Sequence, residues 1–331
     1  MAHSDHLDVR VAPARAFEGG RVIVEAGASP FVVDPFPELR VGGVAAQLTA
    51  ASSRRLAFIA PGGVEGRAPI EVAGATQPIG FVELGRRIAT GLHQVDGPVF
   101  DQAGNLYATV SGTRGQRVPV SIFKITPGGD QQSLVSGIVN ATSLAFDSFG
   151  ELCVTSRFEG AVYRVKADGT VEKIVSELGI ACGLAFTADG TMYVGDRGGT
   201  LFRVNAAGRV FPFASLPASV AAFHVAVDGE DAVYVSGPTL SACDVIYRVD
   251  RRGEVEVFAT GFGRPQGLAV DGAGALHVAE ALAGASGIFR IGAGGRRELM
   301  VAGEGVIGLA FHRERGVAVA SAENAYLFDP W

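Results

Sequence analysis

The chain has 331 residues, of which 48% are hydrophobic and only 19% charged, and its formal net charge is −6. No basic cluster is longer than arginine pairs such as Arg251-Arg252 and Arg296-Arg297, so the charge pattern gives no footprint for a nucleic-acid partner. No apolar run approaches the roughly 18 residues that a membrane-spanning helix needs, which argues against a membrane protein.

Glycine and alternating strands dominate the local pattern. The 46 glycines far exceed the usual share of about 7%, and runs such as RVIVEAG and AVYRVKA alternate apolar and polar residues with the period of a strand. These patterns predict an all-β fold. The three cysteines show no CxxC spacing, so neither a disulfide framework nor a cysteine zinc site is expected.

The first ten residues, MAHSDHLDVR, lack the apolar core of a signal peptide. A cytoplasmic protein is therefore expected from the chain as written. A secreted or periplasmic protein remains the alternative if a signal peptide has been removed.

Residues 1–76 differ from the rest of the chain. Short strands are expected at 21–27, 38–43, 45–51, 55–61 and 67–74, separated by Pro and Gly turns, which predicts a small β-sandwich. The order of GGRVIVEAG, RVGGVAAQLTAASSRRLAFIAPGG and GRAPIEVAG resembles the immunoglobulin-like IPT/TIG family. That resemblance implies a spacer, or a module that contacts a protein or a glycan. Residues 75–80 are the expected linker.

Residues 77–331 carry a repeat of about 40 residues. Equivalent hairpin turns fall 40–46 residues apart, at Asp101, Asp147, Thr187, Asp228, Asp271 and His312. Each unit holds four short strands, the pattern of one blade of a β-propeller. Six copies predict six blades.

The sixth unit is one strand short, because it has only three strand patterns before the sequence ends. The segment 81–94 contains LGRRIAT, which is similar to the fourth-strand segments of other units. We expect 81–94 to pair with the strand at 325–328, because this pairing would close the ring and cover two open sheet edges.

The copies GLAF at 183–186 and GLAV at 267–270 resemble NHL repeats and the SMP-30/gluconolactonase family. The opening DGPVFD at 96–101 is similar to that family's first blade. The resemblance covers 81–331 and implies a propeller that acts on a small molecule at its central channel, as a metal-assisted lactone or ester hydrolase. One divalent cation, Ca²⁺ or Zn²⁺, would be held by oxygen ligands.

The candidate site follows from the geometry of a propeller, because the first strand of each blade lines the channel. The starting positions of these strands are Asp96, Thr142, Cys182, Phe223, Gln266 and Ile307. A second ring, after each second strand, holds Val110, Ser156, Asp196, Gly237, Glu280 and Ser321. In the family resemblance Asp96 is the metal ligand, whereas Thr142 and Cys182 stand where asparagine is expected and Gln266 where aspartate is expected.

In the hydrolase interpretation Glu280 or His224 transfers the proton, and Arg157 or Arg197 orients a carboxylate or an oxyanion. The predicted ligand-binding residues are Gln266, Cys182, Thr142, Phe223 and Asp196. His224 is singled out because the third, fifth and sixth units have glycine at its position, namely Gly183, Gly267 and Gly308.

Gln266 and Glu280, fourteen positions apart, also keep the spacing of the His and Glu in a motif that resembles the virginiamycin B lyase family. Glutamine, however, cannot act as a general base.

Several of these residues also have a purely structural interpretation. Asp96 could form the turn before Gly97, Cys182 could be a small buried hydrophobe, and the two arginines could pair with Asp196 and Glu159. Three functions therefore remain open: a lactonase-like hydrolase, a non-catalytic propeller that binds a small molecule, glycan or protein, and a lyase with a metal-free acid/base site. No P-loop or dinucleotide motif is present, so no nucleotide or organic cofactor is expected.

Overall fold

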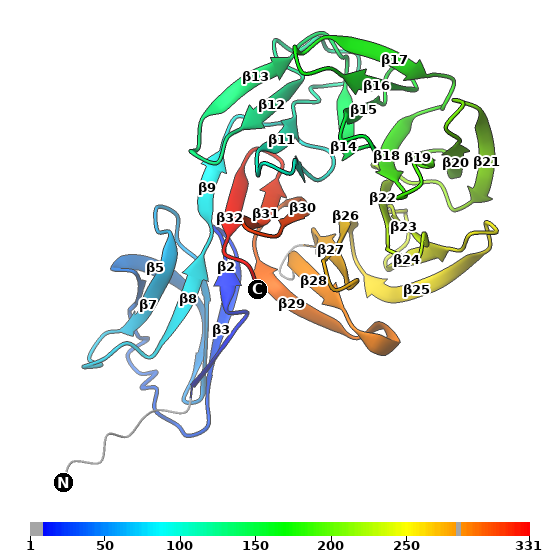
Figure 1. Cartoon of the computed structure of the whole chain (residues 1–331). Coiled ribbons are helices and arrows are strands. Elements are labelled where there is room, and N and C mark those ends of the chain that lie inside the picture. Colours follow the sequence, from blue (N-terminus) through cyan, green and yellow to red (C-terminus); the bar gives the residue numbers. More distant parts are fainter. Residues whose placement is uncertain (1–8, 283–285) are drawn as a thin grey trace.

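The structure, a computed structural model, describes residues 9–282 and 286–331 (Figure 1). In this part of the chain every regular element is a strand except one short 3-10 helix, η1 (Ala293–Gly295). The all-β prediction is therefore confirmed. None of the helices in the described ranges is long and apolar enough to cross a membrane. Residues 1–8 of the predicted first domain lie outside the described residues.

Most of the chain forms four-stranded antiparallel sheets around a central channel, the arrangement of a β-propeller (Figure 1). Five of these sheets are separate. The first sheet contains β10 (Val99–Phe100), β11 (Leu106–Thr109), β12 (Ile122–Ile125) and β13 (Gln131–Val135), and the second contains β14 (Ala141–Phe146), β15 (Leu152–Ser156), β16 (Ala161–Val165) and β17 (Val171–Val175). The third contains β18 (Ala181–Phe186), β19 (Met192–Asp196), β20 (Thr200–Val204) and β21 (Val210–Ser215), and the fourth contains β22 (His224–Val227), β23 (Val233–Ser236), β24 (Asp244–Val249) and β25 (Val255–Phe262). The fifth contains β30 (Val306–His312), β31 (Gly316–Ser321), β32 (Ala325–Phe328) and, from earlier in the chain, β9 (Arg86–Ala89).

Four further strands form the same antiparallel meander at one end of a twelve-stranded sheet. They are β26 (Pro265–Val270), β27 (Leu276–Glu280), β28 (Gly287–Ile291) and β29 (Arg297–Ala302). The first strands β10, β14, β18, β22, β26 and β30 contact one another in cyclic order around the channel. The channel is therefore bordered by one strand from each repeat.

The hairpin turns form where the sequence pattern placed them, and the chemistry of the turn residues explains why. Asp147 accepts hydrogen bonds from the backbone N–H groups of Phe149 and Glu151 at its Oδ1, so its side chain fixes the turn between β14 and β15. Gly150 in the same turn has a φ of 78°, a conformation that glycine adopts without a steric penalty. Asp228 and Asp271 make the same pair of bonds in their own turns.

The N-terminal strands pack around an apolar core to which β29 also contributes Ala302. In β3 (Arg21–Ala26), Val22 and Val24 are fully buried while the polar residues beside them face outward, which is the alternation of a half-buried strand. They share one apolar cluster with Phe58 and Ile70. The other strands of this part are β1 (Val9–Ala12), β2 (Arg15–Ala16), β4 (Leu39–Val41), β5 (Val44–Ser52), β6 (Arg55–Ile59), β7 (Gly66–Val72) and β8 (Gly80–Leu84).

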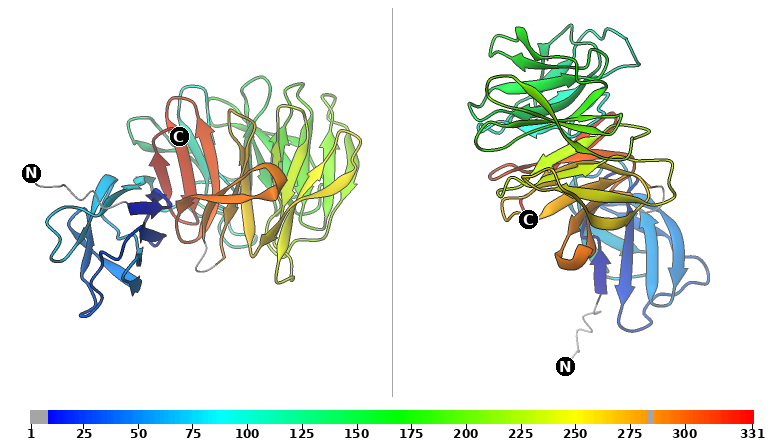
Figure 2. Two further views of the ribbon diagram at one scale, coloured as in Figure 1. Left: turned by 90° about the horizontal axis from the view of Figure 1, so that it is seen from below. Right: turned by 90° about the vertical axis from the view of Figure 1, so that its right-hand side faces the viewer.

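These strands are joined to the propeller by backbone hydrogen bonds. β2 runs parallel between β8 and β29, so the N-terminal strands and β26–β29 form one twelve-stranded sheet. Figure 2 shows the N-terminal strands at the side of the propeller, beside β29. Of residues 75–80, predicted to be a linker, 75–79 lie in the turn between the antiparallel strands β7 and β8, and Gly80 begins β8.

The predicted closing segment 81–94 is divided between two sheets. Its first part, in β8, stays with β7, whereas β9 pairs with β32 and completes the last four-stranded sheet. Gly85 separates the two strands, and a Cβ atom on it would lie 2.5 Å from the ring of Phe328. The phenyl ring of Phe328 therefore fills the space that a side chain at position 85 would need.

We expect Phe328→Ala to lower the free energy of unfolding by about 3–5 kcal/mol, because it leaves a cavity in a buried cluster. Phe328 is 2% exposed and packs with Phe17 and Tyr326. The measurement is denaturant unfolding followed by circular dichroism. The matched control is Phe149→Ala at a phenylalanine that is 86% exposed, where a change below about 0.5 kcal/mol is expected. Equal losses in the two variants would contradict the packing described for Phe328.

Candidate functional site

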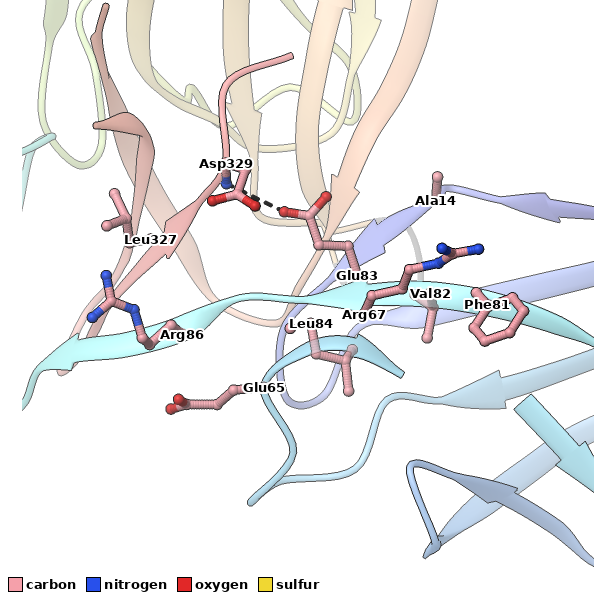
Figure 3. Close-up of a pocket in the computed structure, with 11 residues that line it drawn as sticks. Ala14, Glu65, Arg67, Phe81, Val82, Glu83, Leu84, Arg86, Leu327 and Asp329 are labelled. Carbon is pink, nitrogen blue, oxygen red and sulfur yellow. Dashed lines mark hydrogen bonds between the residues drawn. The ribbon is translucent and has the colours of Figure 1, made fainter. Parts of the chain in front are cut away.

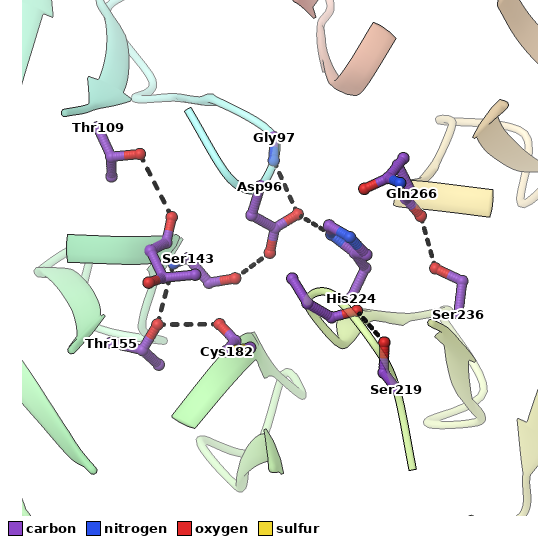
Figure 4. Close-up of polar contacts among 12 residues, drawn as sticks. Asp96, Gly97, Thr109, Ser143, Thr155, Cys182, Ser219, His224, Ser236 and Gln266 are labelled. Atoms are coloured by element: carbon purple, nitrogen blue, oxygen red, sulfur yellow. Dashed lines mark hydrogen bonds and ion pairs between the residues drawn. The ribbon is translucent and has the colours of Figure 1, made fainter. Parts of the chain in front are cut away.

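A buried polar network forms where the inner strands begin. Asp96, just before β10, accepts a hydrogen bond from the Gly97 N–H at 2.7 Å, and the same Oδ1 lies 2.7 Å from Nδ1 of His224. Its other oxygen, Oδ2, accepts a hydrogen bond from Ser143. In Figure 4 the Asp96 carboxylate lies between Ser143 and His224. One carboxylate thus joins three elements across the channel.

His224 is the most enclosed member of this network. It begins β22, is 0% exposed, and pairs with Asp96 through Nδ1. A carboxylate accepts at that nitrogen, so Nδ1 carries a hydrogen. The other ring nitrogen, Nε2, is buried and has no hydrogen-bond partner within the described ranges. The Asp96–His224 pair therefore leaves one imidazole nitrogen uncommitted.

Ser143 was missed by the sequence reasoning, although a signal for it exists. Gly97, Gly183, Gly267 and Gly308 occupy the corresponding positions in four other repeats, because the backbones approach closely there: a Cβ atom on Gly308 would lie 2.5 Å from the Cα of Gly97. Like His224, Ser143 stands where the other repeats have glycine, and this difference could have identified it from the sequence.

Four other residues of the first ring were predicted to bind a ligand. Thr142, Cys182, Phe223 and Gln266 are all buried. Cys182 and Phe223 lie in one hydrophobic cluster with Leu201. These four side chains were expected to surround a shared ligand at an open channel mouth.

Hydrogen bonds reinforce this packing. The hydroxyl of Thr142 donates to the backbone oxygen of Asn140 at 2.9 Å. Thr155 donates to the Cys182 carbonyl at 2.9 Å, and Ser236 donates to the Gln266 carbonyl. The backbones at these positions are therefore fixed to neighbouring strands, which supports a structural role for them.

Cys182 is poorly suited to be a nucleophile. Burial raises the pKa of its thiol to about 11, with Asp96 acting in the same direction and Arg157 and Arg197 opposing it. Near neutral pH the thiol therefore stays protonated, and the thiol is far less nucleophilic than the thiolate.

Glu280 was predicted to transfer a proton. In the structure its carboxylate binds the backbone of the adjoining loops. It is 2% exposed, and its two carboxylate oxygens accept hydrogen bonds from the backbone N–H groups of Gly263, Arg264 and Leu282 at 2.7–2.9 Å. Asp196 does the same for the loop before β18, accepting from the N–H of Ile180 at 2.8 Å. In each case a carboxylate at the end of a second strand fixes the loop that leads into the first strand.

The two predicted anion-binding arginines bind backbone carbonyl groups. Arg157 donates to the oxygen of Gly112 at 3.1 Å, and burial lowers its pKa. Arg197 donates to the oxygens of Ser219 and Val220 at 3.1 and 2.9 Å. The alternative pairing with Asp196 and Glu159 is not seen in the described part, where Glu159 pairs with Lys173 at 2.7 Å.

A cavity of about 350 Å³ occupies the channel beyond Asp96. Its lining includes Asp96 and residues from all six inner strands, and it runs toward the turns that follow those strands, where Phe100, Phe146, Phe186 and Phe311 border it. The space therefore lies on the other side of Asp96 from the predicted mouth. Asp96 is the one predicted site residue that borders this cavity.

A groove of about 680 Å³ lies where the N-terminal strands meet β32 (Figure 3). Glu83 lies at its centre, bonded to Arg15 Nε at 2.8 Å and to the Asp329 N–H at 3.2 Å. Arg67 stacks on Phe81 nearby, with its guanidinium carbon 4.3 Å from the ring centre. The bond between Glu83 and Asp329 joins the N-terminal strands to the end of the propeller, so the residues of this groove have a structural role.

The residues around Asp96 do not fit the cation that the family resemblance implies. Both oxygens of Asp96 are engaged, and the other starting positions supply a hydroxyl, a thiol, an amide and two apolar side chains. Ca²⁺ prefers six to eight oxygen ligands. Across residues 9–282 and 286–331 there is no group of three or more His, Cys, Asp or Glu side chains placed to hold a metal.

No protein-family model and no curated protein sequence matches the chain. Solved structures do resemble it. A gluconolactonase from Xanthomonas campestris matches 74% of this chain and 89% of its own, with a TM-score of 0.60 and 16% identity. A calcium-binding regucalcin from Agrobacterium tumefaciens matches 74% and 96%, with a TM-score of 0.56 and 17% identity. An auxiliary nutrient binding protein from Bacteroides thetaiotaomicron matches 96% of both chains, with a TM-score of 0.58 and 11% identity. The TM-scores show a shared fold, the β-propeller, and at these low identities the likeness extends to the fold alone.

Thiol labelling tests the burial of the cysteines. We expect one fast-reacting thiol in the native protein near neutral pH, that of Cys243, which is exposed. Cys153 and Cys182 are buried, and burial raises their pKa values to about 12 and about 11, so they should react only on unfolding. Cys243→Ser should remove the fast phase. Loss of the fast phase in Cys182→Ser instead would show an accessible, activated Cys182.

Proposed function

We propose that the chain is a non-catalytic β-propeller that binds a small molecule in its central channel. The observation that carries this proposal is the state of Asp96. At the position where a metal ligand was expected, its carboxylate is bonded to His224, Ser143 and the Gly97 N–H. These bonds use three of the roughly four acceptor positions of a carboxylate, so Asp96 has less capacity for a cation than a free carboxylate, although it still borders the cavity.

The extent of the structural likeness supports the same proposal. The gluconolactonase and regucalcin matches cover 74% of the chain, whereas the match to the nutrient binding protein covers 96% of both proteins. The N-terminal strands are thus included only in the last comparison of the three. We carry the general role of that protein, binding a nutrient, over to this chain as part of the proposal.

We also propose that the ring has six blades and that β26–β29 is one of them. These strands form the same antiparallel meander as the five separate sheets, and β26 contacts both β22 and β30. The N-terminal strands are proposed to be an immunoglobulin-like unit of the IPT/TIG type that acts as a rigid spacer and offers a surface to a protein or a glycan. Their shared apolar core, to which the propeller adds Ala302 and Leu299 of β29, supports this assignment.

A lactone or ester hydrolase is the second candidate, and one observation favours it. His224 pairs with Asp96 through Nδ1 and has a free Nε2, which is how an acid/base histidine is oriented in hydrolases. If this function holds, His224 is the proton carrier and no step needs Glu280. A lyase resembling virginiamycin B lyase has less support, because Glu280 is engaged with three backbone N–H groups.

Ligand binding and hydrolysis can be separated in one set of measurements. We expect purified protein to carry no stoichiometric Ca²⁺ or Zn²⁺ by elemental analysis and to leave the hydrolysis of glucono-δ-lactone at its uncatalysed rate. At least one compound in a panel of sugars, sugar acids and amino acids should raise the melting temperature. A ligand at 100 times its Kd stabilises the folded state by about 2.7 kcal/mol.

Asp96→Asn should reduce that thermal shift, because Asp96 borders the channel cavity. Phe149→Ala, at an exposed position, is the control and should retain it. Lactone hydrolysis that requires an added cation and disappears in Asp96→Asn or His224→Ala would establish the hydrolase instead.

A further inference from the structure

A second cavity, of about 690 Å³, lies next to the channel. It is formed by four segments: the end of β26 and the following turn (270–273), the end of β30 and the following turn (311–313), the start of β31 (316–317), and Pro330-Trp331. Phe311 borders both this cavity and the channel cavity. Its volume falls in the range of about 300–1,000 Å³ that is usual for small-molecule sites.

One wall of this cavity is aromatic, and other side chains pack against this wall. The rings of Phe311 and Trp331 pack edge to face, with centroids 6.0 Å apart and an interplanar angle of 89°. His277, fully buried, packs on Phe311 with centroids 4.8 Å apart. Burial lowers the pKa of His277, so this support stays uncharged at neutral pH. The guanidinium of Arg15 lies 4.9 Å from the centre of the Trp331 ring.

Polar groups with unused bonding capacity surround the aromatic wall. Asp271 uses Oδ1 to accept two backbone hydrogen bonds, which leaves Oδ2 only a distant contact of 3.8 Å with His277. Arg313 is exposed and makes no ion pair within the described residues. The indole nitrogen of Trp331 is buried and lacks a hydrogen-bond partner in the same part of the chain. An acceptor and two donors thus lie around one apolar wall.

We propose that this cavity binds a sugar ring. A pyranose has an apolar C–H face that suits an aromatic wall, and a rim of hydroxyl groups that both donate and accept hydrogen bonds. Asp271 would accept from hydroxyl groups, and Arg313 would donate to them. A purely apolar ligand would leave these polar groups without partners, and a simple anion would leave the aromatic wall unused. The inference rests on the proposed small-molecule binding function and adds a ligand class and a second site.

Intrinsic fluorescence tests the site directly, because Trp331 is the only tryptophan in the chain. The probes are maltose, cellobiose and lactose, titrated into the full-length protein while fluorescence is recorded and calorimetry is run in parallel. At least one sugar should give a saturable change in emission with the same midpoint as the heat signal.

Arg313→Ala and Asp271→Asn should each weaken that binding about tenfold or more. The asparagine retains a carbonyl oxygen for the turn bonds that Asp271 makes, so its loss of binding would not reflect a broken turn. Arg252→Ala, at an exposed turn arginine outside this cavity, should leave binding unchanged. Circular dichroism checks that each variant is folded.

Two results would overturn the inference and are distinct from failure of the proposed function. Sugar binding that gives heat but no emission change, and that survives both substitutions, would place the sugar elsewhere. Absence of both signals with all three sugars, while another compound class raises the melting temperature, would exclude the ligand class. A protein that binds no small molecule in any panel would overturn the proposed function itself.

Discussion

The pairing of β9 with β32 is the constraint on which the propeller depends. A strand edge presents unpaired N–H and C=O groups, and a ring of sheets is stable only when its last sheet is complete. Residues 86–89 supply the missing strand from before the first repeat. Gly85 and the Phe328 ring fit together at the same place, so closure and core packing reinforce each other. Everything at the centre of the channel requires this closed ring.

The ring brings Asp96, Ser143 and His224 together from three separate elements. Their bonding explains how a propeller with a lactonase-like fold can lack the donor set of a metal site. A buried carboxylate is costly unless it is paired, and here the partners are a hydroxyl, an imidazole and a backbone N–H. These groups at the channel centre thus bond to one another, and among the described residues only Nε2 of His224 in this network has no partner. The unsatisfied polar atoms of Asp271 and Trp331 lie instead near the turns that follow the first strands, and these are the groups that a ligand could still engage.

The repeat spacing and turn residues predicted the strands of the propeller well, because hairpin chemistry is local. The position of Asp96 at the channel was also predictable, since the first strands of a propeller always border its axis. The directions of the side chains were not predictable from the sequence. Cys182 and Phe223 point into the packing between blades, and Glu280 points to the backbone of a neighbouring loop. These directions depend on contacts with residues that are distant in the sequence. The division of 81–94 at Gly85 and the cavity at Trp331 escaped prediction for the same reason, since each is assembled from segments far apart in the chain.

The position of β2 has a consequence for how the protein is made. Arg15 and Ala16 lie between β8 and β29, opposite Val301 and Ala302. During synthesis, which runs from the N-terminus, β2 cannot complete its pairing until nearly all of the propeller has left the ribosome. The edge of β2 that pairs with β29 must therefore stay unpaired for most of translation. Unpaired strand edges can pair with other chains. Slow elongation, or truncation late in the chain, would therefore favour aggregation of the nascent protein through its N-terminal strands.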